Sequence, residues 1–231
     1  MLLTRHVEGR GAMHRRLSVL LMAAFVVFAV SACGGGGSSQ EQAKARPLPE
    51  DEKALRPGEY RSEEFKPSFS FTVGKGWSNE PPEIPEFLYL PLSESASLSF
   101  WNVQEVYKPS GDMHLVPAPD DMVGWFQRHP HLQTDEPQQT TVGGVKGEQF
   151  DVVVGDLPED YYAVCGTGCV DIAKFGGNWV AFAKGYKEHV VVLEDVKGET
   201  VIINFGSPAT RFDELAPEAQ KVIDSVEWEG T

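Results

Sequence analysis

Two of the three cysteines in this 231-residue chain lie close enough to react with each other. Cys165 and Cys169 are separated only by Gly-Thr-Gly. Outside the cytoplasm such a pair most simply forms a disulfide, and the glycines can adopt the positive φ angles that close a short loop. The loop contributes only about 2 kcal/mol in the chain-entropy treatment, so it would stabilise a turn rather than the fold. A redox or zinc pair is the alternative, but the spacing is not that of thioredoxin and no second cysteine pair is present.

Histidines and acidic residues are the other groups that could hold a metal. His129 and His131 flank Pro130, where they could ligate a surface metal or form the polar end of a helix. Asp120-Asp121, Asp156 with Glu159-Asp160, and Glu194-Asp195 are acidic groups without the Asp-x-Asp-x-Asp-Gly spacing of a calcium loop. We therefore expect caps, turns and solvated surface at these positions, and no metal or cofactor.

The sequence contains no recognisable catalytic motif. It has neither a Gly-x-Ser-x-Gly nucleophile elbow nor a phosphate loop ending in Lys-Ser or Lys-Thr. His189, beside Glu188, is predicted to be an exposed strand residue rather than a base. We expect a protein that is not an enzyme. Paired carboxylates for glycoside hydrolysis stay open as an alternative, because the fold sets their spacing.

Aromatic residues offer a candidate contact surface. Trp77, Trp101 and Trp125 could line a carbohydrate or peptide groove, but aromatic side chains in strands and helices more often belong to a core. Tyr161 and Tyr162 instead precede the cysteine pair in a predicted loop. We therefore predict that these two tyrosines form a contact surface.

The third cysteine, Cys33, follows a segment typical of an export signal. Met13 is followed by a His-Arg-Arg start, the apolar run 17–30 and the small residues before Cys33. Val30-Ser31-Ala32-Cys33 resembles the bacterial lipobox, in which the cysteine is diacylated and becomes the mature N-terminus. The apolar run is shorter than the roughly 20 residues of a spanning helix. We predict a signal peptide over 1–32, with Met13 as an alternative start, and a lipid anchor at Cys33 on the outer side of the membrane.

The charge of the chain restricts its partners. The net charge is −14, and residues 34–231 carry 16 Lys and Arg against 33 Asp and Glu. Such acidity argues against binding to nucleic acid, whose phosphates are neutralised by Lys and Arg, and against adhesion to anionic lipid. Membrane attachment would therefore depend on the acyl chains alone. The acidity itself keeps an exported domain soluble, or attracts a basic partner or a cation.

The segment after Cys33 is predicted to be a tether. Gly34–Gly37 and two serines begin it, and a charged stretch with three prolines continues it to residue 64. A coil of this length has a root-mean-square span of about 30 Å. Residues 33–64 would then hold the folded part, residues 65–231, away from the bilayer.

The folded part is predicted to be α+β, an antiparallel sheet flanked by helices. Alternating or continuous apolar runs predict strands over 69–73, 98–107, 150–154, 179–183, 190–193 and 200–205, with turns at 142–145 and 197–198. A short helix is predicted to be capped by Asp120 and to end at Pro130. A second helix is predicted to start at Pro217, leaving Phe212 and Leu215 in a preceding turn, because a helix through Pro217 would clash with Asp213. Consecutive strands with helices near both ends imply such a layered fold.

This order of elements resembles the PsbP-like fold, a family of α/β/α sandwiches that includes many bacterial lipoproteins. The resemblance covers about 65–228 and rests on packing motifs, which are Phe69-Ser70-Phe71 to Gly76-Trp77, the Trp125 helix, Val142-Gly143-Gly144, and the segment 219–228. Photosystem-associated members bind a photosynthetic membrane complex. The resemblance therefore implies an accessory or binding domain, although fold alone does not establish function.

Together these features predict a lipid-anchored protein of the cell envelope that acts as a non-enzymatic binding or accessory module. Its partner would be another envelope component, contacted through the loops from Tyr161 to Cys169. The alternative is a carrier or sensor of a small ligand or lipid, held in a pocket between sheet and helix. An envelope hydrolase with an acid pair assembled by the fold is the third possibility.

Overall fold

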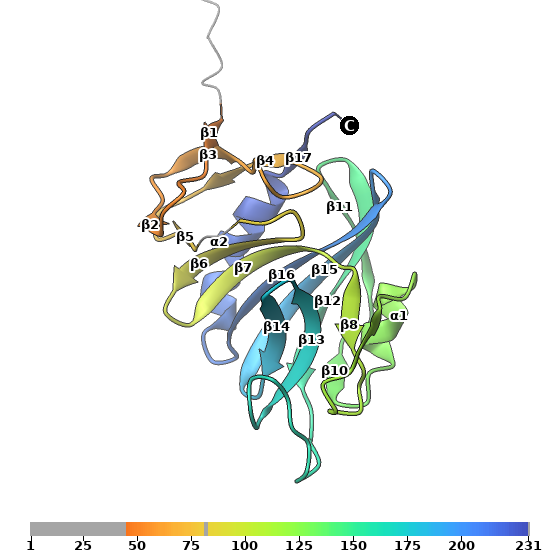
Figure 1. The fold of residues 1–231 in the computed structure, drawn as a ribbon. Helices are drawn as coiled ribbons and strands as arrows, with labels where there is room; N and C mark the ends of the chain where they lie inside the picture. The colour runs from red at the N-terminus through yellow and green to blue at the C-terminus, as the bar shows by residue number, and fades with distance from the viewer. Residues whose placement is uncertain (1–44, 81–82, 231) are drawn as a thin grey trace, which may run out of the picture. The chain divides into compact units, whose positions relative to one another are not determined.

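The computed structural model describes residues 45–80 and 83–230 (Figure 1). The predicted signal peptide, the lipidation of Cys33 and the first part of the predicted tether lie outside these residues. No helix in the described part of the chain is long and apolar enough to cross a membrane.

A seven-stranded antiparallel sheet forms the middle layer of the domain (Figure 1). Its order is β10-β12-β15-β16-β7-β6, and β11 pairs with β12. The strands are β6 (Phe87–Ser93), β7 (Ala96–Asn102), β10 (Leu132–Thr134), β11 (Gln138–Val142), β12 (Val145–Val154), β15 (Tyr186–Val196) and β16 (Glu199–Pro208). Gly143 and Gly144 join β11 to β12, and Lys197 and Gly198 join β15 to β16, all with positive φ. Both predicted turns are confirmed.

Adjacent residues of the central sheet belong to two different cores. In β16, Ile203 and Phe205 belong to one core and Ile202 to the other, because successive side chains of a strand point to opposite faces. The continuous apolar runs in β15 and β16 are therefore the pattern of strands covered on both faces.

One face of the central sheet is covered by α2 (Phe212–Asp224) and a small sheet. That sheet has the order β1-β3-β4-β17. Its strands are β1 (Arg46–Pro47), β3 (Gly58–Arg61), β4 (Phe69–Val73) and β17 (Glu227–Trp228), with β2 (Lys53–Ala54) and β5 (Ser78–Asn79) paired nearby. The ring of Phe69 lies 4.6 Å from that of Phe100 and 5.0 Å from that of Trp228. Aromatic packing therefore joins the small sheet to the central one.

The opposite face is covered mainly by a second sheet, of order β14-β13-β8-β9. Its strands are β8 (Glu105–Tyr107), β9 (Leu115–Pro117), β13 (Cys169–Phe175) and β14 (Asn178–Ala183). The short helix α1 (Met122–Gln127) completes this layer. The predicted antiparallel sheet with helices is therefore found only in part, since strands provide most of the layer expected to be helical.

The two helices differ in detail from their predictions. Asp121, not Asp120, caps α1, and its carboxylate accepts a hydrogen bond from the backbone N of Gly124 at 2.6 Å. Helix α2 begins at Phe212 and runs through Pro217, so the predicted start at Pro217 is wrong. The ring of Phe212 is buried 5.8 Å from that of Phe205. This tertiary packing holds the first turn in place against the local cost of the proline.

The domain begins before Phe65. Strand β3 pairs with β4 over four residues, and Leu55 and Tyr60 are buried in the core. The described part of the predicted tether, 45–64, is therefore folded, and the predicted boundary at Phe65 lies too late in the chain. Charged residues and prolines suggested a coil, but short strands with one buried position carry little periodic signal.

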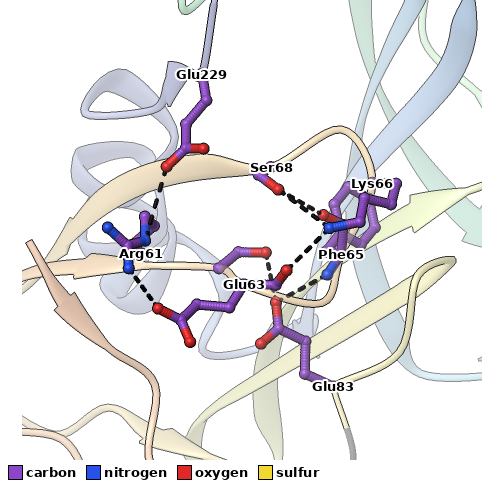
Figure 2. Close-up of polar contacts among 8 residues, drawn as sticks. Arg61, Glu63, Phe65, Lys66, Ser68, Glu83 and Glu229 are labelled. Carbon is purple, nitrogen blue, oxygen red and sulfur yellow. Dashed lines mark hydrogen bonds and ion pairs between the residues drawn. The ribbon is translucent and has the colours of Figure 1, made fainter.

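Polar contacts tie the β3–β4 connection to distant segments, as Figure 2 shows. The carboxylate of Glu83 accepts hydrogen bonds from the Ser62 hydroxyl and, at 3.1 Å, from the backbone N of Phe65. Arg61 pairs with Glu63 and lies 3.7 Å from a carboxylate oxygen of Glu229, close to the end of the chain. These contacts connect the segment between β3 and β4 to Glu83, and strand β3 to Glu229. Their role is structural.

Candidate functional site

The structure separates the two tyrosines that the sequence predicted as one contact surface. Tyr162 is 54% exposed, whereas Tyr161 is only 7% exposed and its ring centroid lies 4.8 Å from that of His131. Burial, with Asp171 nearby, raises the pKa of Tyr161 to about 12. The prediction is therefore wrong for Tyr161, which is part of the core, and only Tyr162 presents an accessible ring.

The predicted disulfide joins Cys165 to Cys169. Ala163, just before this loop, and Gly166, inside it, exchange backbone hydrogen bonds of 3.1 and 2.9 Å. The buried carboxylate of Asp171 accepts a hydrogen bond of 2.7 Å from the backbone N of Val164, and burial raises its pKa. The disulfide thus closes a tight turn, as its spacing predicted.

The histidine pair is not a surface pair. His129 is buried directly after α1, and burial, with a smaller contribution from His131, lowers its pKa to about 4. Its ring centroid lies 5.1 Å from that of Trp125, and its Nδ1 accepts a hydrogen bond of 3.3 Å from the backbone N of His131. Nowhere in residues 45–80 and 83–230 do three or more His, Cys, Asp or Glu side chains gather as metal ligands.

Several of the acidic residues cap helices or turns or form surface ion pairs. Asp121 caps α1, and Asp195 accepts a hydrogen bond of 2.9 Å from the backbone N of Gly198 in the β15–β16 turn. Asp156 lies 3.6 Å from the ammonium of Lys184 on the surface. These positions have the capping, turn and surface roles that their spacing predicted.

A cavity of about 540 Å³ lies between the central sheet and strand β14. We call it the polar groove. Its lining includes Phe87 and Tyr89 of β6, Ser97 and Ser99 of β7, Tyr186 and Glu188 of β15, Asn204 and Gly206 of β16, Asn178 to Ala181 with Ala183 of β14, and Cys165. The disulfide turn therefore borders the groove, and the volume lies within the range of small-molecule sites.

The central sheet presents polar residues to this groove in two cross-strand rows. Strand register places Tyr89, Ser99 and Asn204 in one row, and Ser97, Gly206 and Glu188 in the next. Farther along the same strands and on the same face, Trp101, Val190 and Ile202 are packed into the apolar core. One face of one sheet thus changes from apolar to polar where the covering sheet leaves a cavity.

Glu188 is the most unusual residue of the polar groove. It is 6% exposed, and its Oε2 accepts a hydrogen bond of 3.0 Å from Nδ2 of Asn204. Its Oε1 has no hydrogen-bond partner among the described residues. Burial raises the pKa of Glu188 to about 8, partly opposed by the bond from Asn204, so the carboxyl is mostly protonated at neutral pH. A protonated carboxyl can both donate and accept hydrogen bonds.

The neighbouring residues leave room for this carboxyl and hold it in place. A Cβ on Gly206 would lie 2.1 Å from Oε2 of Glu188, so a side chain at 206 cannot coexist with the observed carboxyl position. Ser99 accepts a hydrogen bond of 2.6 Å from Trp101 Nε1 and lies 3.5 Å from the carbonyl oxygen of Asn204. The buried polar groups therefore form a connected network, which orders them.

Aromatic side chains line the more open part of the polar groove. Trp179 is 48% exposed, and Tyr89 and Tyr186 are half-buried. A large exposed indole beside buried polar groups presents both an apolar face and hydrogen-bonding partners to one ligand.

Sequence reasoning missed these residues. A usable signal was present, because Ser97, Ser99, Asn204 and Glu188 interrupt strands whose other positions are largely apolar. His189 was also misjudged, since it is half-buried and its Nδ1 lies 2.8 Å from Oδ1 of Asp151 instead of facing solvent.

Comparison with protein-family models and with curated proteins found no match. Among solved structures, the solution structure of cyanobacterial PsbP (CyanoP) from Synechocystis sp. PCC 6803 is 11% identical, with a TM-score of 0.42, and the match covers 75% of this chain and 94% of that one. The crystal structure of LpqN, involved in cell envelope biogenesis of Mycobacterium tuberculosis, is 12% identical, with a TM-score of 0.33, covering 77% and 90%. A PsbP structure is thus among the solved structures to which this chain is similar.

Proposed function

We propose that this protein is a lipid-anchored envelope protein that binds a neutral polar ligand in the polar groove. The observation that carries the proposal is the carboxyl of Glu188, which is buried beside a cavity with one oxygen unpartnered among the described residues. This oxygen is not among the fully buried side-chain atoms that lack a partner, so it is accessible from the cavity. A ligand in the groove can therefore exchange a hydrogen bond with it.

The lining of the polar groove favours a ligand rich in hydroxyl or amide groups. Glu188 is mostly protonated at neutral pH, and no Lys or Arg is among the described residues that line the cavity. Serine, asparagine and a protonated carboxyl exchange hydrogen bonds with neutral groups, whereas a charged ligand would lack a buried counter-ion. Trp179 adds an aromatic surface for a flat apolar face. A saccharide combines these features and is the ligand class that we propose.

We further propose binding without catalysis. The groove has one buried carboxyl, that of Glu188, while Glu80 and Glu94 on its lining are exposed. Hydrolysis of a glycosidic bond commonly uses two carboxyl groups with contrasting environments on either side of that bond. Incubation of the protein with each bound saccharide should release no reducing ends, and measurable release would overturn this part of the proposal.

The binding proposal is tested by titrating the purified protein with a panel of saccharides in a calorimeter. We expect at least one to bind, and Trp179→Ala to weaken it about tenfold, equivalent to ~1.4 kcal/mol. Tyr162→Ala is the matched control, because it removes an exposed ring that does not line the groove. Absence of binding across the panel, or equal binding by Trp179→Ala, would reject the proposal.

In this proposal, the lipid anchor at Cys33 holds the protein at the membrane, on the side facing away from the cytoplasm. A disulfide in the domain is in keeping with a compartment outside the cytoplasm. Cys33→Ser should abolish acyl labelling and release the protein from membranes. Labelling retained at another residue would contradict the anchor.

A second candidate function is contact with another envelope protein through the disulfide turn. Tyr162 and Val164 are exposed residues with large apolar side chains, directly before the loop that Cys165 and Cys169 close. Crosslinking in intact cells, followed by mass spectrometry, should then capture one dominant envelope protein, and Tyr162→Ala should lose it. Capture unchanged by this substitution would exclude the turn as the contact.

A further inference from the structure

A second cavity, of about 580 Å³, lies on the opposite face of the central sheet. We call it the acid-rimmed groove. It lies between helix α2 and strands β12, β15 and β16, where its apolar lining comprises Phe205, Phe212, Ala216, Ala219 and Ile223. A ligand would therefore meet one face of the helix and part of the sheet beneath it.

The rim of this groove carries an excess of negative charge. Asp135, Glu136, Asp151 and Asp213 line it, and no Lys or Arg is among its described lining residues. Such a concentration of one charge beside an apolar surface attracts the opposite charge. The net charge of −14 of the whole chain also attracts cations.

Lys187, which lies beside the groove, shows that an ammonium group is stabilised here. Its Nζ lies 2.7 Å from Oδ2 of Asp151 and 4.5 Å from the ring centroid of Phe212. A carboxylate and an aromatic face together form a favourable site for a cation. Asp151, Asp213 and Asp135 all raise the pKa of Lys187, the hydrogen bond with Asp151 being the largest cause.

His189, on the neighbouring strand, orients the carboxylate of Asp151. Residues 151, 189 and 205 are direct cross-strand neighbours on β12, β15 and β16. Nδ1 of His189 lies 2.8 Å from Oδ1 of Asp151, so the carboxylate is held between His189 and Lys187. Of the rim carboxylates, Asp151 is thus preorganised by its place on the sheet, whereas Asp213 lies in helix α2 and Asp135 lies between β10 and β11.

We propose that the acid-rimmed groove is a second binding site, which takes an organic ammonium ion with an apolar body. The apolar part would lie on Phe205, Ala216 and Ile223. The ammonium would lie toward Asp213 and Asp135, beyond the position that Lys187 already occupies. Charge complementarity selects this class over a neutral or anionic amphiphile of the same size.

The test compares three probes of equal chain length, hexylammonium, hexanol and hexanoate, with the purified protein. We expect hexylammonium to bind at least about tenfold more tightly than hexanol, and hexanoate to be the weakest. Its affinity should fall with added salt, because the rim carboxylates are exposed to screening. Amide chemical shifts should change at Gln220, Asp151 and His189, which line the groove.

Three substitutions on α2 separate charge from shape. Asp213→Asn should weaken hexylammonium about threefold to tenfold, while Glu214→Gln, an adjacent exposed carboxylate outside the lining, should leave it unchanged. Ala216→Phe should block binding by filling the apolar surface. Equal affinity for hexanol, no effect of Asp213→Asn, or shift changes confined to the polar groove would overturn the proposal.

Discussion

The two grooves lie on opposite faces of the same sheet and place their polar groups in opposite ways. In the polar groove, Glu188, Asn204 and Ser99 are buried and the large aromatic Trp179 is exposed. In the acid-rimmed groove the aromatic rings of Phe205 and Phe212 are buried, and Asp213 and other carboxylates stand at the exposed rim. The first arrangement suits hydrogen bonding to a neutral ligand, and the second suits an apolar ligand with an exposed positive charge.

The difference arises from what covers each face. Helix α2 covers apolar strand positions, so its face carries stability and its charges remain at the edge where solvent screens them. The β14 sheet leaves part of its face open, and the strands below carry polar side chains there. Substitutions of core residues should therefore affect stability, whereas substitutions of groove residues should mainly affect binding.

The largest expected effect is on the α2 face. Ile203→Ala removes a fully buried side chain from the core, and we expect it to lower the free energy of unfolding by about 2–5 kcal/mol. Chemical denaturation followed by circular dichroism measures this loss. Glu194→Ala, at an exposed position of the same sheet, is the control and should change stability by less than about 0.5 kcal/mol. Similar losses in both variants would contradict the assignment of stability to this face.

The next effect is on the polar groove. Gly206→Ala introduces a Cβ that would lie 2.1 Å from Oε2 of Glu188, and overpacking of this kind costs about 1–3 kcal/mol. It should also abolish saccharide binding, because the carboxyl must move. Combining it with Glu188→Ala should recover part of the stability and none of the binding. If Gly206→Ala bound ligand normally, the position of Glu188 would not matter for binding.

A pH-dependent effect follows from the raised pKa of Glu188, about 8 against a usual value of 4.5. Between these two values the unfolded chain loses the proton while the folded chain retains it. Stability is therefore greatest at low pH for this group and falls as pH rises, by up to about 1.4 kcal/mol per pH unit. Denaturation curves from pH 5 to 8 should show this fall in the wild type and a flatter profile in Glu188→Gln. Parallel profiles would show that the carboxyl is not protonated in the folded state.

The smallest effect on stability is expected at the aromatic edge of the polar groove. Trp179→Ala removes a side chain that is already 48% exposed, so the unfolding free energy should change by no more than about 0.5 kcal/mol. The same variant should lose saccharide affinity, as proposed above. A large loss of stability instead would assign Trp179 to packing and remove it from the binding surface.

Local chemistry made the turns and the disulfide predictable. The glycines at 143, 144 and 198 adopt the positive φ that glycine readily takes. Cys165 and Cys169 are paired because Gly166 and Gly168 adopt positive φ and turn the short chain between them. Helix α2 shows the limit of local reasoning. Pro217 predicted a helix that starts at 217, but the helix starts at Phe212, because the side chain of Phe212 is buried in the core.

Neither groove could be located in this way. The row Tyr89, Ser99 and Asn204 joins the neighbouring strands β6 and β7 to β16, where Asn204 lies 105 positions after Ser99. Tyr161 and Tyr162 are adjacent in the sequence, yet one is buried and the other exposed, because the loop packs one ring against His131. Residue type predicted an aromatic surface here, but only packing decided which ring is accessible.

The sequence alone determined the acidity of the domain, the alternation that builds its strands, the tight turns and the proximity of Cys165 and Cys169. Each of these depends on residues within a few positions of one another. Tertiary structure decided which polar strand residues share a face, which of them are buried, and where each covering layer leaves a cavity. The physical reason is that strand register and layer packing are set by contacts between distant segments, and a shift of one residue would turn Glu188 and Asn204 to the other face.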